Sequence, residues 1–300
     1  MRELLYILSP SFSGSTLLTF LLAAHPEIAT VGELKASAIG DVESYRCSCG
    51  ALLKQCDFWR KVKTGMKKSG VEFDFDDFGT HFTSGPAWFR RLVRLGARNP
   101  LLSQSSSQLL RIVPFCRSRL ERTIGQNRIL IDLIASIQGG RIFLDASKDP
   151  ERLTQLLLSK QWKIRVVHLL RDGRGVSSSY KKHHNVDMKS AAAEWLRTER
   201  ACVHVAARMA RKDVLTVKYE DVCREPQRTI EEIFAFAGLV HGISVNGAIP
   251  ESGHVLGNAM RLSGGKRILL DERWRTELLP CDLRVFDAIG GDLNRRRGYM

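Results

Sequence analysis

The sequence lacks an apolar stretch long enough to cross a membrane as a helix, which takes about 20 residues. Residues 4–24 are fairly apolar, but Ser9, Pro10 and the small polar residues 13–16 interrupt them. A signal peptide needs an uninterrupted apolar segment at that place. We therefore expect a soluble, cytoplasmic protein that keeps its N-terminus.

Cysteine is too scarce for a disulfide framework. There are seven cysteines in 300 residues, and an odd number in a chain of this length is typical of thiols in a reducing compartment. Cys47, Cys49 and Cys56 cluster as C-x-C-x6-C. Three thiolates can join a fourth ligand on zinc, but the usual pair of C-x2-C knuckles is absent. Reduced or redox-active thiols are favoured, with zinc or a disulfide left open.

Acidic residues are also in short supply. Lys and Arg number 46 against 32 Asp and Glu, which gives a net charge of +14 and points to an anionic partner. Residues 86–128 hold nine arginines and a single acid, Glu121, so this segment is a candidate for contact with an anionic surface. Aromatic residues make up 8% and do not alternate with basic ones. We therefore expect no nucleic-acid partner, although a non-catalytic protein that binds nucleic acid or an anionic polymer remains an alternative.

Short apolar runs followed by helical patterns organise the chain. The runs lie at 4–8, 141–145, 164–170 and 214–219, and the helical patterns at 15–24, 150–160, 173–182 and 226–238. This alternation predicts an α/β fold, a three-layer, P-loop-like parallel sheet flanked by helices. Residues 57–137 break the rhythm and are predicted to form a mostly helical insertion in a single domain spanning 1–300. Within the insertion, 88–95 reads as a basic amphipathic helix and 103–108 as a polar loop.

The segment from Ser9 to Thr16 joins the first strand to the first helix and is rich in small residues. Such a loop directs backbone N–H groups and the positive end of the helix toward an anion. Compared with a nucleotide-binding P-loop, Ser9 replaces the first glycine and Ser15 replaces the lysine. The missing lysine argues against ATP or GTP hydrolysis, so a P-loop small-molecule kinase is only an alternative. An ordinary turn with serine caps is equally compatible with the loop alone.

Arg171 follows another predicted strand, at the sheet edge where ligands of α/β proteins bind. Ser179 lies eight residues on, about two helical turns later. Both side chains are therefore candidates for the same anion.

Together these segments resemble the sulfotransferases that use 3′-phosphoadenosine 5′-phosphosulfate (PAPS), and especially the bacterial branch related to the tyrosylprotein sulfotransferases. The segments that carry the resemblance occur in the family's order. They are Ser11–Leu18, His25-Pro26-Glu27 with Gly32-Glu33, Ser147–Pro150, Arg171–Arg174 with Ser179, and Lys218–Asp221 with Pro226 and Phe234–Leu239.

The resemblance implies in-line sulfuryl transfer to a hydroxyl or amine acceptor, without a metal. Glu33 would be the general base, and Lys148 would stabilise the leaving oxygen. The acceptor is unidentified and could be a saccharide, a lipid, a peptide or a small molecule. The residues implied in cofactor binding are Ser11, Phe12, Ser13, Gly14, Ser15 and Thr16 at the 5′-phosphosulfate, and Arg171, Ser179, Arg261 and Lys266 at the 3′-phosphate.

One residue departs from the family's pattern. Phe12 stands where the family usually has Lys or Arg in the phosphosulfate loop. The missing positive charge must then come from Lys148, Lys35 or a late residue such as Lys266, or else catalysis is weakened.

Overall fold

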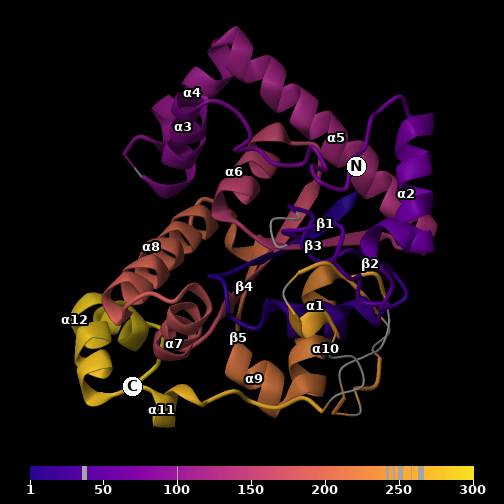
Figure 1. The fold of residues 1–300 in the computed structure, drawn as a ribbon. Coiled ribbons are helices and arrows are strands. Elements are labelled where there is room, and N and C mark those ends of the chain that lie inside the picture. The colour runs from indigo at the N-terminus through magenta and orange to yellow at the C-terminus, as the bar shows by residue number, and fades with distance from the viewer. Residues whose placement is uncertain are drawn as a thin grey trace.

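The fold is built on a sheet of five parallel strands in the order β2-β3-β1-β4-β5 (Figure 1). The computed structural model describes residues 1–300 except 36–38, 100, 241–242, 246, 249–252, 258 and 263–266. The strands are β1 (Glu3–Leu8), β2 (Ile28–Thr30), β3 (Ile142–Lys148), β4 (Lys163–Leu170) and β5 (Val214–Lys218). The predicted α/β fold with a parallel sheet is confirmed.

Twelve α-helices lie within the described residues. They are α1 (Ser15–Ala23), α2 (Asp57–Lys68), α3 (Ala87–Arg98), α4 (Ser103–Ile112), α5 (Pro114–Gln138), α6 (Pro150–Ser159), α7 (Gly173–His184), α8 (Met188–Ala206), α9 (Tyr219–Arg224), α10 (Pro226–Ala237), α11 (Trp274–Glu277) and α12 (Pro280–Arg296). None of them combines the length and apolar character needed to cross a membrane.

The sheet is buried on both faces because its strands are apolar on both sides, as parallel sheets require. In β1, Leu5 and Ile7 pack into a core with α1, α9 and α10. Leu4, Tyr6 and Leu8 point the other way, into a larger core with α2, α3, α5, α6 and α8. Figure 1 shows these two groups of helices on opposite sides of the sheet.

The four predicted strands are present, each with bounds close to those expected. Strand β2 was missed because it has only three residues. It is nevertheless fixed in place by pairing with β3, Ile28 beside Ile142 and Thr30 beside Leu144. This edge strand leads directly into Glu33.

The predicted polar loop at 103–108 is wrong, because these residues begin helix α4. The hydroxyls of Ser106 and Ser107 donate to the Ser103 carbonyl, at 3.1 and 2.7 Å, so the helix itself satisfies them. Small residues also allow α4 to approach α3 closely: a Cβ added to Gly96 would lie 3.2 Å from Ser106 Oγ. Tertiary packing here outweighs the loop propensity of serine.

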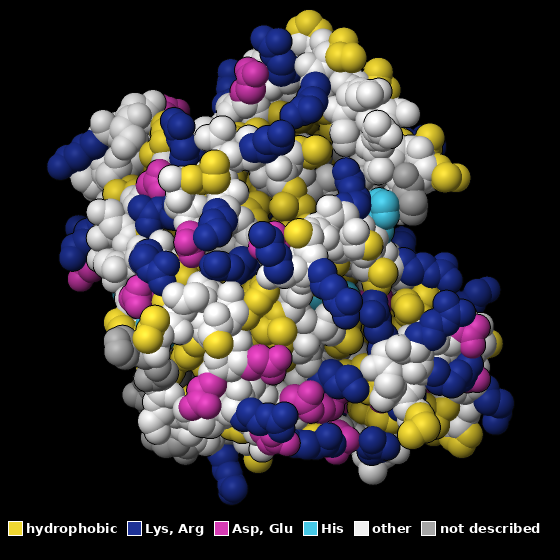
Figure 2. Space-filling view, turned by 180° about the vertical axis from the view of Figure 1, so that it is seen from behind, with side chains coloured by type: hydrophobic (Ala, Val, Ile, Leu, Met, Phe, Trp, Pro, Cys, Tyr) yellow, Lys and Arg dark blue, Asp and Glu magenta, His cyan; other side chains and the backbone are white. Residues whose placement is uncertain are grey.

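Helix α3 is the predicted basic amphipathic helix. It buries Phe89, Val93 and Ala97 and leaves most of its arginines in solvent. Three arginines of the 86–128 segment have partners: Arg98 pairs with Glu151, Arg117 with the exposed Glu121, and Arg119 donates to the Ser84 carbonyl. On the face drawn in Figure 2, Lys and Arg side chains are spread widely with acidic side chains among them.

Candidate active site

The loop between β1 and α1 closes around a glycine that no other residue can replace. Gly14 caps α1 in the left-handed conformation, with φ 87°. A Cβ at this position would lie 2.2 Å from Cδ2 of Tyr219, which is too close for any side chain. The first-turn N–H groups of α1 have no acceptor within the helix, so this end of the helix is suited to an anion.

Buried serine hydroxyls surround the same loop. Ser9 and Ser13 are 1% and 0% exposed, and within the described part of the chain neither Oγ has a hydrogen-bond partner. Ser177 Oγ, in the first turns of α7, is in the same state. Unpaired buried hydroxyls are costly and are rare without a reason. They indicate groups that a polar ligand would satisfy.

Arg171 links the ends of three strands. It leaves the carboxyl end of β4 and donates from Nη1 to the carbonyl of Phe12, at 2.8 Å, and from Nη2 to that of Asp271, also at 2.8 Å. Its guanidinium lies over the ring of Tyr219, 4.4 Å from the centroid. The predicted phosphosulfate loop and the predicted 3′-phosphate residue are therefore in direct contact.

A cavity of about 700 Å³ opens beside this contact. It is lined by both predicted elements, Phe12 and Gly14 from the loop and Arg171 and Ser179 from the β4–α7 segment. The remaining lining residues are Gly175, Ser178, Lys182, His183, Tyr219, Met260, Leu269, Leu270, Asp271, Arg273, Trp274 and Glu277. The cavity thus combines aromatic side chains with three cations that are paired with carboxylates, Arg171 and Arg273 with Asp271, and Lys182 with Glu277.

Phe12 is packed into the site and does not leave a gap there. Its ring lies 5.2 Å from that of His183 and 6.1 Å from those of Tyr180 and His184. All three partners belong to α7. The residue that replaces the family's Lys or Arg therefore joins the loop to the helix that begins just after Arg171.

Glu33 and Lys148, the two predicted catalytic residues, form an ion pair with Nζ 2.5 Å from Oε1. Both side chains are nearly buried, 10% and 13% exposed respectively. A Cβ on Gly257 would stand 3.3 Å from Glu33 Oε1 and 3.8 Å from Thr16 Oγ1. The pair therefore lies beside the first turn of α1, near the predicted phosphosulfate position.

Left-handed backbone at non-glycine residues coincides with the site. Among the described residues, four non-glycine residues have positive φ, and two of them, Lys160 and Asn185, are ordinary helix C-caps. The other two are Phe12, with φ 65°, and Lys148, with φ 64°. Such strain persists only where the surroundings hold it, and it concentrates at functional sites.

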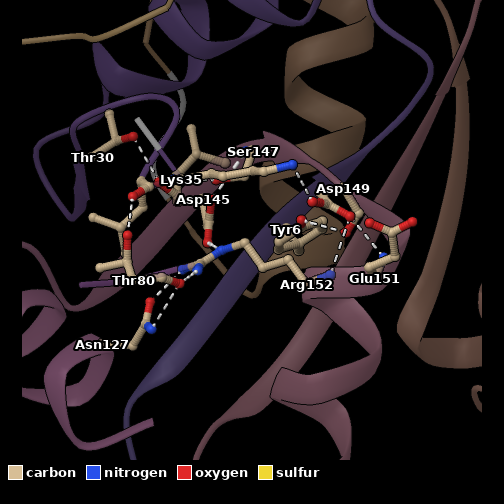
Figure 3. A network of polar contacts seen from close by, with 12 residues as sticks. Tyr6, Thr30, Lys35, Thr80, Asn127, Asp145, Ser147, Asp149, Glu151 and Arg152 are labelled. Carbon is tan, nitrogen blue, oxygen red and sulfur yellow. Dashed lines mark hydrogen bonds and ion pairs between the residues drawn. The ribbon is translucent and has the colours of Figure 1, made fainter. Parts of the chain in front are cut away.

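A polar network beneath Lys148 holds that strained turn (Figure 3). Asp149 caps α6 and accepts from Lys35 Nζ at 2.6 Å, while Ser147 Oγ accepts from the Lys35 N–H at 3.0 Å. The Tyr6 hydroxyl donates to the Asp149 carbonyl at 2.9 Å. Lys35, considered above as a source of charge for the transfer, is engaged by Asp149.

Arg152 anchors the same network from below (Figure 3). Its Nε donates to Asp145 Oδ2 at 2.8 Å, Nη1 to the Thr80 carbonyl at 2.9 Å, and Nη2 to Asn127 Oδ1 at 2.6 Å. Arg152 and Asp145 are essentially inaccessible to solvent. The ion pair of Arg152 with Asp145 was not predicted from the sequence. The groups that contact Arg152 come from separate segments, the loop that contains Thr80, helix α5 and strand β3.

Arg261 and Lys266, the two basic residues predicted at the 3′-phosphate from the C-terminal part of the chain, differ in what the structure describes. Arg261 lies over the ring of Tyr45, 3.8 Å from its centroid, and donates to the carbonyls of Gly257 and Arg46. It therefore ties the 257 segment to residues 45–46. Lys266 lies outside the described residues.

Several cavity residues were missed from the sequence. Tyr219 directly follows β5, so the strand-end rule that found Arg171 would also have found it. Its hydroxyl accepts from the Asp271 N–H at 3.2 Å, and burial raises its pKa. Hydrogen bonds from Arg273 hold the pKa of Asp271 below its usual range. Arg273 and Trp274 follow no strand, and only the fold brings them here.

Comparisons with known proteins agree with this geometry. Residues 5–241 match the model of the sulfotransferase family. The chain is similar in structure to the sulfotransferase domain of the Synechococcus PCC 7002 olefin synthase, with 18% identity, a TM-score of 0.51, and 95% of this chain and 93% of that one covered. For the sulfotransferase domain from the curacin biosynthetic pathway, the identity is 16%, the TM-score 0.53, and the coverage 100% and 99%. A comparison with curated proteins gives no match.

Proposed function

The chain belongs to the sulfotransferase family, and on that premise we propose that it moves a sulfuryl group from PAPS to a hydroxyl-bearing acceptor. One observation carries the proposal. The β1–α1 loop and the Arg171–Ser179 segment line a single cavity, and the Glu33–Lys148 pair lies beside the first turn of the same helix α1. The family match favours neither the kinase nor the non-catalytic alternative.

The residues present fit PAPS. The cavity, at about 700 Å³, lies within the usual range for ligand pockets, roughly 300–1,000 Å³. Ser13 and Ser9 offer unpaired buried hydroxyls at the loop, where the 5′-phosphosulfate would lie with residues 11–16. Arg171 and Ser179, which line the cavity, would hold the 3′-phosphate. PAPS supplies a sulfuryl group attached to a phosphate that can leave.

Glu33 and Lys148 divide the remaining chemistry. Glu33 would accept the proton of the acceptor hydroxyl as the oxygen attacks, because its carboxylate is held beside Thr16. Lys148 would stabilise negative charge on the leaving phosphate oxygen with its ammonium group. The left-handed backbone at Lys148, supported by Asp149 and Ser147, fixes the position from which the Lys148 side chain extends. A base in this position supports the tyrosylprotein-related branch, and no step requires a metal.

Glu33→Gln tests the proposal most directly. The amide keeps the side chain's shape but cannot accept the proton, so turnover should fall about 10²–10⁴-fold. Binding of the bisphosphate product should hardly change. Transfer from labelled PAPS into an extract of the source cell measures turnover, and calorimetry with 3′-phosphoadenosine 5′-phosphate measures binding.

The matched control is Glu43→Gln, an exposed glutamate paired with Lys54, which should leave both measurements unchanged. Full turnover in Glu33→Gln would mean that another group is the base. Absence of any product from the wild-type chain, together with no binding of the bisphosphate, would contradict the proposed function itself.

A further inference from the structure

Three cysteines and one histidine converge outside the proposed active site. Cys47, Cys49 and Cys56 cluster in the sequence, and His254 reaches them from nearly 200 residues further on. Each residue offers one ligand atom, and the four atoms all lie within 4.8 Å of one another. The fourth ligand that the sequence left open is therefore provided by the fold.

The spacing of these atoms fits a metal ion at their centre. His254 Nδ1 lies 3.6 Å from Cys47 Sγ and 3.3 Å from Cys56 Sγ, and the sulfurs of Cys49 and Cys56 are 3.6 Å apart. Tetrahedral zinc with ordinary bond lengths has edges of about 3.8 Å between sulfurs and about 3.6 Å between sulfur and nitrogen. These three edges agree to within about 0.3 Å, and the other three are no longer than 4.8 Å.

The surrounding backbone presents the ligands. The turn at 47–51 is closed by bonds from the Cys47 N–H to the Ala51 carbonyl and from the Gly50 N–H to the Cys47 carbonyl, each 2.9 Å. Cys56 is the N-cap of α2, so the start of that helix fixes the position of its side chain. None of the four residues has a role in the proposed transfer.

A second layer of contacts orients the histidine. The ring of Phe58 stacks on that of His254, with centroids 4.4 Å apart and planes 3° from parallel. Ser48 Oγ donates to the Gly253 carbonyl at 2.9 Å and accepts from the Val255 N–H at 2.8 Å. Both neighbours of His254 are thus bound to the residue between two of the cysteines. These contacts hold the ring and the backbone of His254 in place.

We propose that Cys47, Cys49, Cys56 and His254 bind a zinc ion. Three thiolates and an imidazole in a tetrahedron suit zinc, and four protein ligands leave no open position for catalysis. The site is therefore structural. Its role is to clamp the 253–257 segment onto the start of the helical insertion.

The zinc clamp would also affect the proposed active site, a consequence that rests on the proposed function. Leu256 pairs with the chain beside Glu33, through Leu256 N–H to the Val31 carbonyl at 2.7 Å and Glu33 N–H to the Leu256 carbonyl at 3.4 Å. Gly257 then passes beside Glu33 Oε1. Zinc at His254 would hold this segment in register, and so would hold the wall that confines the Glu33 carboxylate.

The test is the metal content of the full chain, purified without added metal or chelator and measured by mass spectrometry. The expected result is about one zinc ion per chain. Replacement of zinc by cobalt should give the intense visible absorption of a tetrahedral cobalt thiolate site. Neither readout depends on sulfuryl transfer, so a failure of the proposed function would leave this test unaffected.

Two variants locate the site. Cys49→Ser and His254→Ala should lose most of the zinc and the cobalt absorption, and both ligands are accessible enough to change without a large loss of core packing. Cys281→Ser and His204→Ala are matched controls that change an exposed cysteine and a histidine elsewhere, and they should keep both. Circular dichroism on each variant separates loss of metal from loss of fold.

Three outcomes would overturn the proposal. The first is a folded wild-type chain that contains no metal and takes up neither zinc nor cobalt. The second is a Cys49–Cys56 disulfide found by peptide mapping of freshly purified protein. The third is unchanged metal content in both Cys49→Ser and His254→Ala.

Discussion

Two polar regions lie near the carboxyl edge of the same sheet, and they differ in how their polar atoms are satisfied. Around Arg152, each guanidinium nitrogen donates to a buried oxygen of Asp145, Thr80 or Asn127. Around the β1–α1 loop and the start of α7, the hydroxyls of Ser9, Ser13 and Ser177 are buried and, among the described residues, have no partner.

The difference distinguishes a region that supports the fold from a region that is suited to bind a ligand. A buried network whose polar atoms all have hydrogen-bond partners makes its surroundings rigid and needs no ligand. Buried polar atoms without partners are unfavourable, and a ligand that hydrogen-bonds to them removes that cost. The Arg152 network therefore supports the Lys148 turn, and under the proposed function phosphate oxygens would satisfy the loop hydroxyls. Changes in the first region should lower stability, and changes in the second should lower affinity.

The largest expected effect is on stability, from Arg152→Met. Removing the guanidinium leaves the carboxylate of Asp145, which is 0% exposed, buried without its cation. Breaking a buried pair on one side costs about 3–5 kcal/mol. Urea unfolding measures the loss, and the double variant Arg152→Met with Asp145→Leu should recover part of it. A single variant with wild-type stability would show that the network is not the support inferred here.

Arg171→Ala should act mainly on affinity. Charge-assisted hydrogen bonds contribute about 1.5–3 kcal/mol each, so the preference for 3′-phosphoadenosine 5′-phosphate over AMP should fall about tenfold or more. The ratio of the two affinities, measured by calorimetry, cancels any general effect of losing the contacts to Phe12 and Asp271. Arg228→Ala, which removes an exposed ion pair with Glu225, is the control. A wild-type chain that binds both nucleotides equally would contradict the assignment.

Ser147 and Ser13 allow the two regions to be compared through the same type of residue. Ser147 is buried and its hydroxyl is satisfied, so Ser147→Ala should cost about 1 kcal/mol of stability and leave nucleotide affinity unchanged. Ser13 is buried with an unpaired hydroxyl, so Ser13→Ala should keep stability and weaken binding of the bisphosphate a few-fold. Thermal melts with and without the bisphosphate distinguish them. Identical behaviour of the two variants would remove the contrast between the regions.

The smallest effect concerns acid stability. Burial raises the pKa of Asp149, but the charge and hydrogen bond of Lys35, with two backbone N–H groups, outweigh burial and hold it below the ordinary value of 3.8. A depressed carboxyl pKa stabilises the fold above the unfolded-state pKa, and that contribution is lost as pH falls through the folded-state pKa. The stability difference between wild type and Lys35→Met should therefore be present at neutral pH and shrink below about pH 4. Lys54→Met, which breaks an exposed pair with Glu43, should show hardly any difference. A Lys35→Met difference that persists in acid would assign its effect to packing.

Much of the fold and part of the candidate site could be predicted from local pattern. Strands such as Leu4–Leu8 are apolar on both faces, and the helices after them show a helical period, so the parallel sheet followed from side-chain burial alone. The Ser9–Thr16 loop and Arg171 were found because each directly follows a strand, and Glu33 was found from the resemblance to the family. Short β2 and the serine-rich start of α4 were missed, because pairing with β3 and close packing on α3 outweigh their local signals.

Other features depend on which loops meet, and no local pattern encodes that. Strand order brings Tyr219 against Gly14, and the C-terminal segment brings Trp274 into the cavity. Glu33 and Lys148 form an ion pair although they lie more than 100 positions apart in the sequence. The buried network of Arg152 reaches Thr80, 72 positions away. His254 reaches Cys56 across 198 positions. Local patterns are enough to specify the helices and strands, because apolar residues recur along each of them with its own period. The sites depend on the tertiary fold, because their geometry comes from contacts between distant segments.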